Sequence, residues 1–359
     1  MLLNIKKFAG GLAVAAVITT SAPSFALSIM LSDTGNVAAN NGFRKAADIW
    51  ESFFKDDVTV NIASGFASLG PGIVGEAGST YFDTSYAVMK ASLGADATSA
   101  ADAVMVAGLP AGESYSKLIN GTWESANLHG NQRYTQSGVQ SVQMTRANAK
   151  ALGLIAADDI TIDGEITFSS NFNFDFDSSD GISVGNMDFI GVALHEIGHS
   201  LGFVSGVDVL DYYSYFYGPI YSDAAYSPFA TPLDFTRCSD ESEAKGADID
   251  WTAGSAAKHF AINGQCASGA RVDNAWSTGS YRGDGRQASH WKDNAGLGIL
   301  DPTAVYGEFL QISQLDLFAF DVIGWDVQQK HTSVPEPSCL VLLSTALLGP
   351  GFMRRRRVR

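Results

Sequence analysis

Apolar positions along the chain follow two different periods, which predict helical and extended segments. Over Gly42–Phe54 the apolar residues recur at helical spacing and would form one face of a helix. Apolar and polar residues alternate at Val58–Ile62 as in a strand, and Ile160–Phe168 is expected to form a strand or hairpin. Further helices are expected at Asp83–Leu93, at Thr145–Leu154 with Thr145 as the cap, and at 313–327 with a glycine stop. This mixture predicts an α+β fold.

An apolar run, Met187–Leu201, contains the motif His195-Glu196-x-x-His199. It has no proline, so a helix is expected. Residues four apart share one face of a helix, so His195 and His199 can direct their imidazoles to one point. Two neutral imidazoles at this spacing suit Zn²⁺, and Glu196 falls beside them, where it can take a proton from water. Gly202 would let the helix end in a sharp turn. The segment predicts the active site of a zinc hydrolase.

A catalytic zinc needs a third protein ligand, and the residues alone leave its identity open. His290, in Ser-His-Trp-Lys, is the preferred candidate, and Asp208 and His259 are the alternatives. The other two histidines are less suitable. His129 lies in Gly/Asn-rich sequence and His331 adjoins the C-terminal tail.

The extended motif followed by a distant His-Trp pair resembles the metzincin zinc metallopeptidases, and in particular their leishmanolysin-like branch. In the usual metzincin pattern a third histidine follows three residues after the glycine, whereas this chain has Ser205 there. The leishmanolysin-like branch has a long insertion before its third ligand. The resemblance therefore implies His195, His199 and His290 as zinc ligands and Glu196 as the general base.

The same resemblance, which covers roughly Asp158 to Trp325, implies a metzincin-like two-lobed fold. A twisted mixed sheet and helices would lie above the zinc helix, and an irregular lobe would lie below it. Leu300 stands where the family has the methionine of its Met-turn, and leucine fills a similar volume at a cost of less than about 1.5 kcal/mol. In this family an edge strand above the metal pairs with extended substrate, and Glu165–Ser169 is expected to be that strand. Tyr306 is a candidate donor to the developing oxyanion.

The two ends of the chain differ from the body and predict export. Residues 1–26 combine two lysines, a short apolar segment and small residues before a cleavage position, as in a secretory signal peptide. Residues 334–359 combine Val-Pro-Glu-Pro-Ser, an apolar run and four consecutive arginines, which resembles the PEP-CTERM sorting signal of Gram-negative bacteria. That resemblance implies an exosortase-type processing enzyme, transient anchoring in the inner membrane, and a final place at the cell envelope, on the outer surface or outside the cell. A plain tail anchor is the alternative. The peptidase domain would span 27–333, with an upper lobe at about 27–202 and a lower lobe at about 203–333.

Charge and cysteine content restrict the partners further. The formal net charge of −15 at pH 7 argues against nucleic acid or anionic lipid, so membrane contact is expected only through the C-terminal tail. Cys238 and Cys266 are expected to form a disulfide in an oxidising compartment. The acidic segment Asp175–Asp180 is a candidate Ca²⁺ site, but it lacks the EF-hand spacing and a solvated turn is favoured.

Together these features predict a secreted zinc-dependent metalloendopeptidase. It would hydrolyse peptide bonds of a protein or peptide substrate through a metal-activated water, with Glu196 as the general base. One alternative is a non-catalytic zinc-containing protein that binds the cell surface or a biofilm matrix. Another is a zinc amidase acting on the cell envelope. The presence of Glu196 favours an enzyme, because a structural zinc site has no need of a base.

Overall fold

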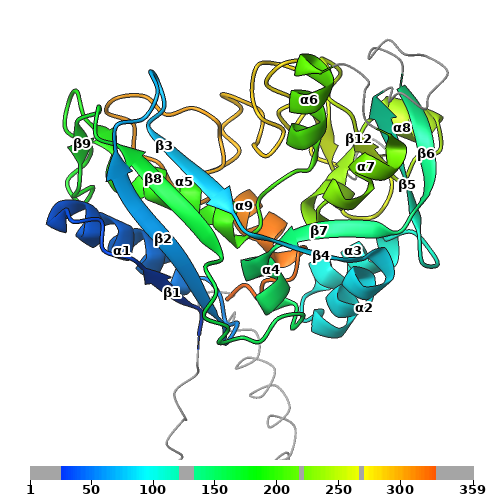
Figure 1. Ribbon diagram of the computed structural model, residues 1–359, viewed down its shortest axis with the longest axis horizontal. Coiled ribbons are helices and arrows are strands. Elements are labelled where there is room, and N and C mark those ends of the chain that lie inside the picture. Colours follow the sequence, from blue (N-terminus) through cyan, green and yellow to red (C-terminus); the bar gives the residue numbers. More distant parts are fainter. Residues whose placement is uncertain (1–25, 121–132, 218–221, 267–270, 329–359) are drawn as a thin grey trace, which may run out of the picture.

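The computed structural model describes residues 26–120, 133–217, 222–266 and 271–328 (Figure 1). The expected signal peptide, apart from Ala26, lies outside these ranges, and so do the expected tail, His129 and His331. Within them, helices and several small sheets are mixed, which confirms the predicted α+β class. No helix in the described ranges combines the length and the apolar character that a membrane span requires.

The largest sheet has four strands and lies beside the helix that carries the histidine motif (Figure 1). Its strands, in spatial order, are β1 (Ser28–Leu31), β2 (Thr59–Ala67), β8 (Gly164–Ser169) and β3 (Gly75–Ser79). β1, β2 and β8 run parallel, whereas β3 is antiparallel to β8. The expected strands at 58–62 and 160–168 correspond to β2 and β8. The second begins only at Gly164, and Ile160 before it is 90% exposed.

The edge strand beside the motif is not the expected one. Glu165–Ser169 belongs to β8, which has β2 on one side and β3 on the other, so its backbone is already paired. The edge strand on the side of the motif helix is β3, whose sequence Gly-Glu-Ala-Gly-Ser has no apolar alternation that would indicate a strand. This segment is extended because it pairs with β8 in the folded protein, a contact that its own composition does not encode.

Helix α1 (Val37–Glu51) packs directly against the motif helix, α5 (Phe189–Leu201). Its buried apolar residues recur at helical spacing and include Phe43, Ala46, Ala47 and Trp50. The helix begins before the expected Gly42 because the Asn36 side chain caps it there. The indole N–H of Trp50 donates to the carbonyl of Leu194 at 3.0 Å and joins the two helices in the core.

The right-hand part of the molecule in Figure 1 contains a two-stranded sheet, a three-stranded sheet and short helices. β4 (Tyr81–Ser85) pairs antiparallel with β7 (Ser141–Thr145), and the sheet has the order β12 (Ile249–Trp251), β5 (Tyr115–Asn120), β6 (Arg133–Val139). The helices here are α2 (Tyr86–Asp96), α3 (Ala100–Gly108) and α4 (Arg146–Ala151). α2 and α4 confirm the helices expected at 83–93 and 145–154, and Thr145 caps α4 as predicted.

The expected boundary between lobes at residue 202 does not separate the chain into two bodies. β12, from beyond this boundary, pairs in parallel with β5, from before it. The N–H of Gln143 also donates to the carbonyl of Ala230 at 2.9 Å. One hydrophobic core contains buried residues from Leu27 to Trp325. Segments before and after α5 therefore build the right-hand part together.

The remaining elements are short and lie mainly between α5 and the end of the described chain. They are β9 (Phe174–Asp175), β10 (Met187–Asp188), α6 (Val207–Phe216), α7 (Asp223–Tyr226), the 3₁₀ helices Ser227–Phe229 and Pro232–Thr236, β11 (Arg237–Cys238), α8 (Asp240–Ala244), β13 (His259–Phe260) and α9 (Gln314–Asp321). α9 confirms the expected closing helix, and the chain turns after it at Gly324, whose φ is 101°. The predicted disulfide between Cys238 and Cys266 is present. It joins two parts of the long segment that separates α5 from His290.

Candidate metal centre

Helix α5 holds the first part of the site. Its N-terminus is capped by Asp188, whose carboxylate accepts the N–H of Gly191 at 2.9 Å, and it ends at Gly202, whose φ is 127°. Every residue of α5 is buried except His195, which is partly exposed. The helix predicted over Met187–Leu201 is confirmed, with its first two residues paired to β9 instead. A buried helix with one partly open position suits the floor of a cleft.

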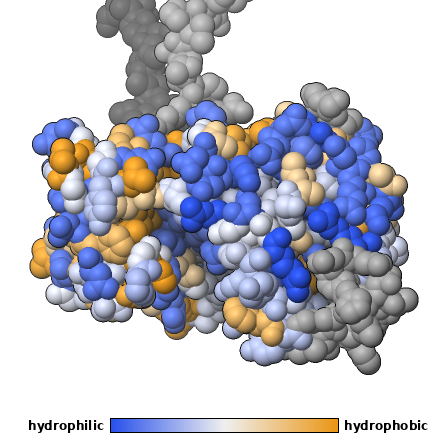
Figure 2. Space-filling model, turned by 90° about the horizontal axis from the view of Figure 1, so that it is seen from above, coloured by the Kyte–Doolittle hydropathy of each residue, from blue (hydrophilic) through white to orange (hydrophobic). Residues whose placement is uncertain are grey.

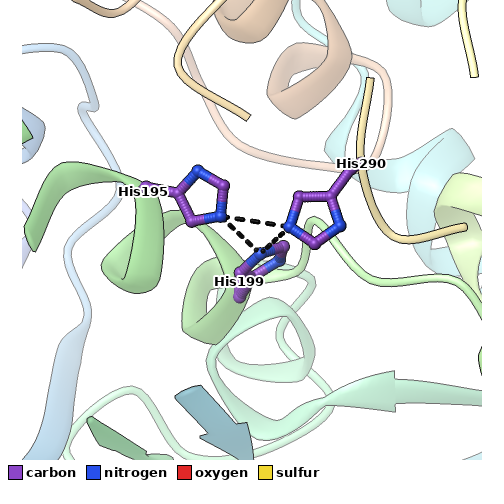
Figure 3. Close-up of side chains that lie close together, drawn as sticks. All are labelled: His195, His199 and His290. Atoms are coloured by element: carbon purple, nitrogen blue, oxygen red, sulfur yellow. Dashed lines mark hydrogen bonds between the residues drawn. The ribbon is translucent and has the colours of Figure 1, made fainter. Parts of the chain in front are cut away.

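Three imidazoles meet at one point beside this helix (Figure 3). The Nε2 atoms of His195, His199 and His290 form a triangle in which every side measures 3.1 Å. His195 and His199 come from successive turns of α5, whereas His290 comes from an irregular segment that runs beside them, at the right in Figure 3. In the described part of the chain this is the one group of His, Cys, Asp or Glu side chains gathered closely enough to hold a metal ion.

The hydrogen bond that each ring makes through Nδ1 determines whether its Nε2 carries a proton or a lone pair. The Nδ1–H of His195 donates to the carbonyl of Ile299 at 2.8 Å, and that of His199 to the carbonyl of Phe203 at 2.7 Å. The third ring donates to the carbonyl of Gln287 at a longer 3.3 Å. With its proton on Nδ1, each imidazole directs an Nε2 lone pair into the triangle. Three lone pairs facing one another repel, and a cation between them removes that repulsion.

The imidazoles are also in the protonation state that a metal needs. Burial lowers the pKa of His195 to about 4. Burial and the neighbouring His195 ring lower the pKa of His199 to about 3. Burial and both neighbouring rings hold the pKa of His290 well below its usual range. All three are therefore neutral at pH 7, as metal ligands must be.

The spacing of the triangle fits a zinc ion. Two nitrogens bound to one tetrahedral zinc at about 2.0–2.1 Å lie about 3.3 Å apart. The 3.1 Å separations here are close to that value. Three protein ligands also leave a fourth position open, as catalytic zinc sites do and structural ones do not.

The structure decides between the candidates for the third position in the cluster. His290 completes the triangle. The carboxylate of Asp208 is bonded instead to the N–H groups of Ala288 and Ser289, at 2.6 and 3.1 Å. His259 lies in β13, and its Nδ1 is 3.2 Å from a carboxylate oxygen of Asp273.

Leu300, which stands where the resemblance implied a floor for the site, packs against α5. It is fully buried. Its two terminal methyl groups lie 3.4 Å from the position that a Cβ on Gly198 would take, on α5 between the two motif histidines. The neighbouring carbonyl of Ile299 accepts the hydrogen bond from His195. The same short segment therefore packs against α5 and makes the hydrogen bond to the His195 ring.

Glu196 lies in the same cleft as the three histidines. The cleft has a volume of about 560 Å³ and is lined by residues of 72–77, of α5, of 286–290 and of 299–304, with Leu310. Glu196 is only 7% exposed, and burial, followed by the nearby carboxylate of Glu76, raises its pKa to about 8. A carboxyl group with a pKa near neutrality can both accept and return a proton.

Three contributors to the cleft were not found from the sequence. β3 forms one wall and brings Gly75 and Glu76 to the site, although nothing in its composition indicated a strand. The loop before β3 contributes Ile73, which is 40% exposed. Seen from above, the surface of the molecule carries more apolar residues at the left than at the right (Figure 2). Arg286 also lines the cleft and pairs with Asp293 at 3.0 Å. Its place four residues before His290 was the signal that could have indicated it.

Two further sequence-based candidates are not part of this centre. Tyr306 is 55% exposed and is not among the residues that line the cleft. In the candidate Ca²⁺ segment, Asp175 accepts the N–H groups of Asp177 and Ser183, and Asp177 accepts the N–H of Ser179. These carboxylates stabilise turns of the backbone, which agrees with the solvated turn that was favoured.

Comparison with protein-family models, with curated proteins and with solved structures found no match to this chain. The function is therefore inferred from the geometry of the site.

Proposed function

We propose that the protein is a zinc-dependent metalloendopeptidase. One observation carries the proposal. Three neutral imidazoles, each hydrogen-bonded through its Nδ1, place their Nε2 atoms 3.1 Å apart. Their cleft also contains the buried carboxyl group of Glu196. The residues fit zinc in donor type, spacing and number. A non-catalytic metal site would not need a buried carboxyl group beside an open position.

The chemistry divides between the metal and Glu196. When bound, a zinc ion supplies Lewis acidity, which lowers the pKa of water and polarises a carbonyl group. Glu196 takes the proton from the attacking water and delivers it to the leaving amine. The pKa of Glu196 must fall for the first of these transfers. It will do so when positive charge lies between the three imidazoles, because a nearby cation favours the ionised carboxylate.

The shape of the cleft favours an extended polypeptide as substrate. Residues 75–77 of β3 line the cleft, and β3 is an edge strand that pairs with β8 on one side. A peptide in extended conformation can add to such an edge through main-chain hydrogen bonds, which gives affinity without a strict sequence requirement. The antiparallel edge strand, the distant third histidine and the floor at Leu300 all support the proposed relation to leishmanolysin-like metzincins.

Export remains part of the proposal. The Cys238–Cys266 disulfide supports an oxidising compartment. The secretory signal, the PEP-CTERM tail and processing by an exosortase-type enzyme stay predictions from residues outside the described ranges. Residues 28–79 form three of the four strands of the main sheet, so a prosegment cannot be removed from them without dismantling that sheet.

The test compares four forms of the full-length chain for zinc content and casein hydrolysis: the wild type, Glu196→Gln, His290→Ala and the control His259→Ala. His259 is a buried histidine outside the triangle, so its variant should keep zinc and activity. His290→Ala should lose both. Glu196→Gln should keep zinc and lose activity by roughly 10²–10⁴-fold.

Each departure from this pattern has a definite meaning. Zinc binding by the wild type without hydrolysis of protein would favour a binding protein, and hydrolysis of cell-wall amides alone would favour an amidase. Undiminished hydrolysis by Glu196→Gln would remove Glu196 from the mechanism. Equal zinc content in His290→Ala and the wild type would overturn the metal site.

A further inference from the structure

The third histidine is positioned differently from the other two. His195 and His199 are placed by the helical backbone of α5, and each Nδ1 makes a short hydrogen bond, of 2.8 and 2.7 Å. His290 lies 91 residues after His199 on a segment without regular structure, and its own ring bond to Gln287 is 3.3 Å long. Something other than local secondary structure must hold it at the triangle.

Asp208, in the first turn of α6, bonds the two residues that precede His290. Its carboxylate accepts the N–H of Ala288 at 2.6 Å, the N–H of Ser289 at 3.1 Å and the hydroxyl of Ser289 at 2.5 Å. Three donors converge on one carboxylate, and bonds to an ionised acceptor are the stronger kind. The backbone immediately before His290 is thereby fixed to α6.

Ser205 binds the same segment from the turn that follows α5. Its N–H donates to the hydroxyl oxygen of Ser289 at 2.8 Å, so that hydroxyl is both donor and acceptor. Ser205 occupies the position, three residues after Gly202, at which the usual metzincin pattern has its third histidine. On the opposite side, the buried guanidinium of Arg237 donates to the carbonyl of Ala288 at 3.1 Å.

We propose that Asp208 and Ser289 are positioning residues for the metal centre, and that they determine its affinity for zinc by holding His290 against the end of α5. The inference rests on the proposed metal site. Where a local ligand would have stood, the chain places Ser205 instead, which binds the segment that carries a distant ligand. Without these hydrogen bonds, His290 would sample many positions. Zinc binding would then have to order its side chain and backbone, and the entropy lost would lower the affinity.

The experiment measures the zinc dissociation constant of the full-length chain by competition with a chromophoric chelator. Asp208→Asn and Ser289→Ala should each raise it by roughly 10–100-fold, the range for partners that orient metal ligands. Ser289→Thr keeps the hydroxyl and should restore most of the affinity. The Co²⁺-substituted protein gives a second readout, because loss of an ordered third nitrogen weakens the visible absorption of a tetrahedral site.

Asp211 provides the matched control. It lies one turn further along α6, is 1% exposed, and accepts the N–H groups of Tyr281 and Arg282 at 2.8 and 2.9 Å. Asp211→Asn therefore removes the charge of a similar buried carboxylate on the same helix, but one that is not bonded to Ala288 or Ser289. It should lower thermal stability as much as Asp208→Asn does and leave the zinc dissociation constant unchanged.

The outcomes separate this inference from the proposed function. If wild type binds zinc tightly and His290→Ala does not, but Asp208→Asn and Ser289→Ala match Asp211→Asn in affinity, the positioning role is wrong and the metal site stands. If the wild type and His290→Ala bind zinc equally, the proposed site itself fails. If Asp208→Asn does not fold, Ser289→Ala and Ser289→Thr alone decide the question, since they change one hydroxyl.

Discussion

Replacement of Leu300 tests whether the packing of this side chain against α5 stabilises the protein and the cluster of three histidines. Leu300 is fully buried, and its methyl groups are in van der Waals contact with the position of a Cβ on Gly198. Leu300→Ala should leave a cavity there and lower the free energy of unfolding by about 2–5 kcal/mol. For a domain of this size, a loss of about 3 kcal/mol lowers the melting temperature by roughly 5 °C. Leu300→Met keeps the volume and should lower the free energy of unfolding by less than about 1.5 kcal/mol.

The same substitution should weaken zinc binding, because the carbonyl of Ile299 next to it orients His195 through a 2.8 Å hydrogen bond. Relaxation of the backbone into the cavity would lengthen this bond, and a loss of about tenfold in zinc affinity is expected for Leu300→Ala. Urea unfolding of the metal-free protein gives the stability, and chelator competition gives the affinity.

A leucine outside the site supplies the control. Leu93 in α2 is 4% exposed and does not contact the metal centre, so Leu93→Ala should lower stability without changing zinc affinity. The reasoning is refuted if Leu300→Ala unfolds at the same urea concentration as Leu300→Met. It is also refuted if Leu300→Ala and Leu93→Ala bind zinc equally well.

Three other predictions follow from the site and its surroundings. Gly75→Ala would place a Cβ 3.2 Å from a carboxylate oxygen of Glu196, so kcat should fall while the zinc content measured on the same samples stays constant. Burial and neighbouring carboxylates raise the pKa of Asp96 to about 7. Between about pH 4 and pH 7, Asp96 therefore holds a proton in the folded state that the unfolded chain has already released. The stability from this proton is therefore lost as the pH rises towards 7, and melting curves of Asp96→Asn at pH 5 to 8 should depend less on pH than those of the wild type. Reduction of the Cys238–Cys266 disulfide should cost about 3–4 kcal/mol of unfolding free energy by the loop-entropy relation, and equal melting with and without reductant would contradict this.

Elements with strong local signals were predictable. The helix α5 was found because a proline-free apolar run of that length has few other conformations, and α4 because Thr145 marks its cap. β3 was missed for the opposite reason. Its glycines, glutamate and small residues are extended only because β8 offers them backbone partners. A strand whose stability depends on its neighbour leaves little trace in its own sequence.

The candidate metal site also has one part that local spacing predicted and another that it did not. Spacing alone placed His195 and His199 together, because residues four apart on a helix must share a face. His290 was one of three candidates, and neither spacing nor composition could eliminate Asp208. The structure shows Asp208 outside the cluster of imidazoles, with its carboxylate bonded to the N–H groups of the two residues before His290. Its nearness along the chain did not reveal this contact.

The sequence by itself determined the α+β class, the motif helix that brings His195, Glu196 and His199 to one place, and the disulfide, since each depends on short-range periodicity or on rare residue types. The tertiary structure decided which histidine completes the triangle, which strand presents the free edge and how Ser205 and Asp208 are used. The physical reason is that these features depend on hydrogen bonds and packing between segments far apart in the chain. Such contacts form only when the whole core assembles, so no local pattern can encode them.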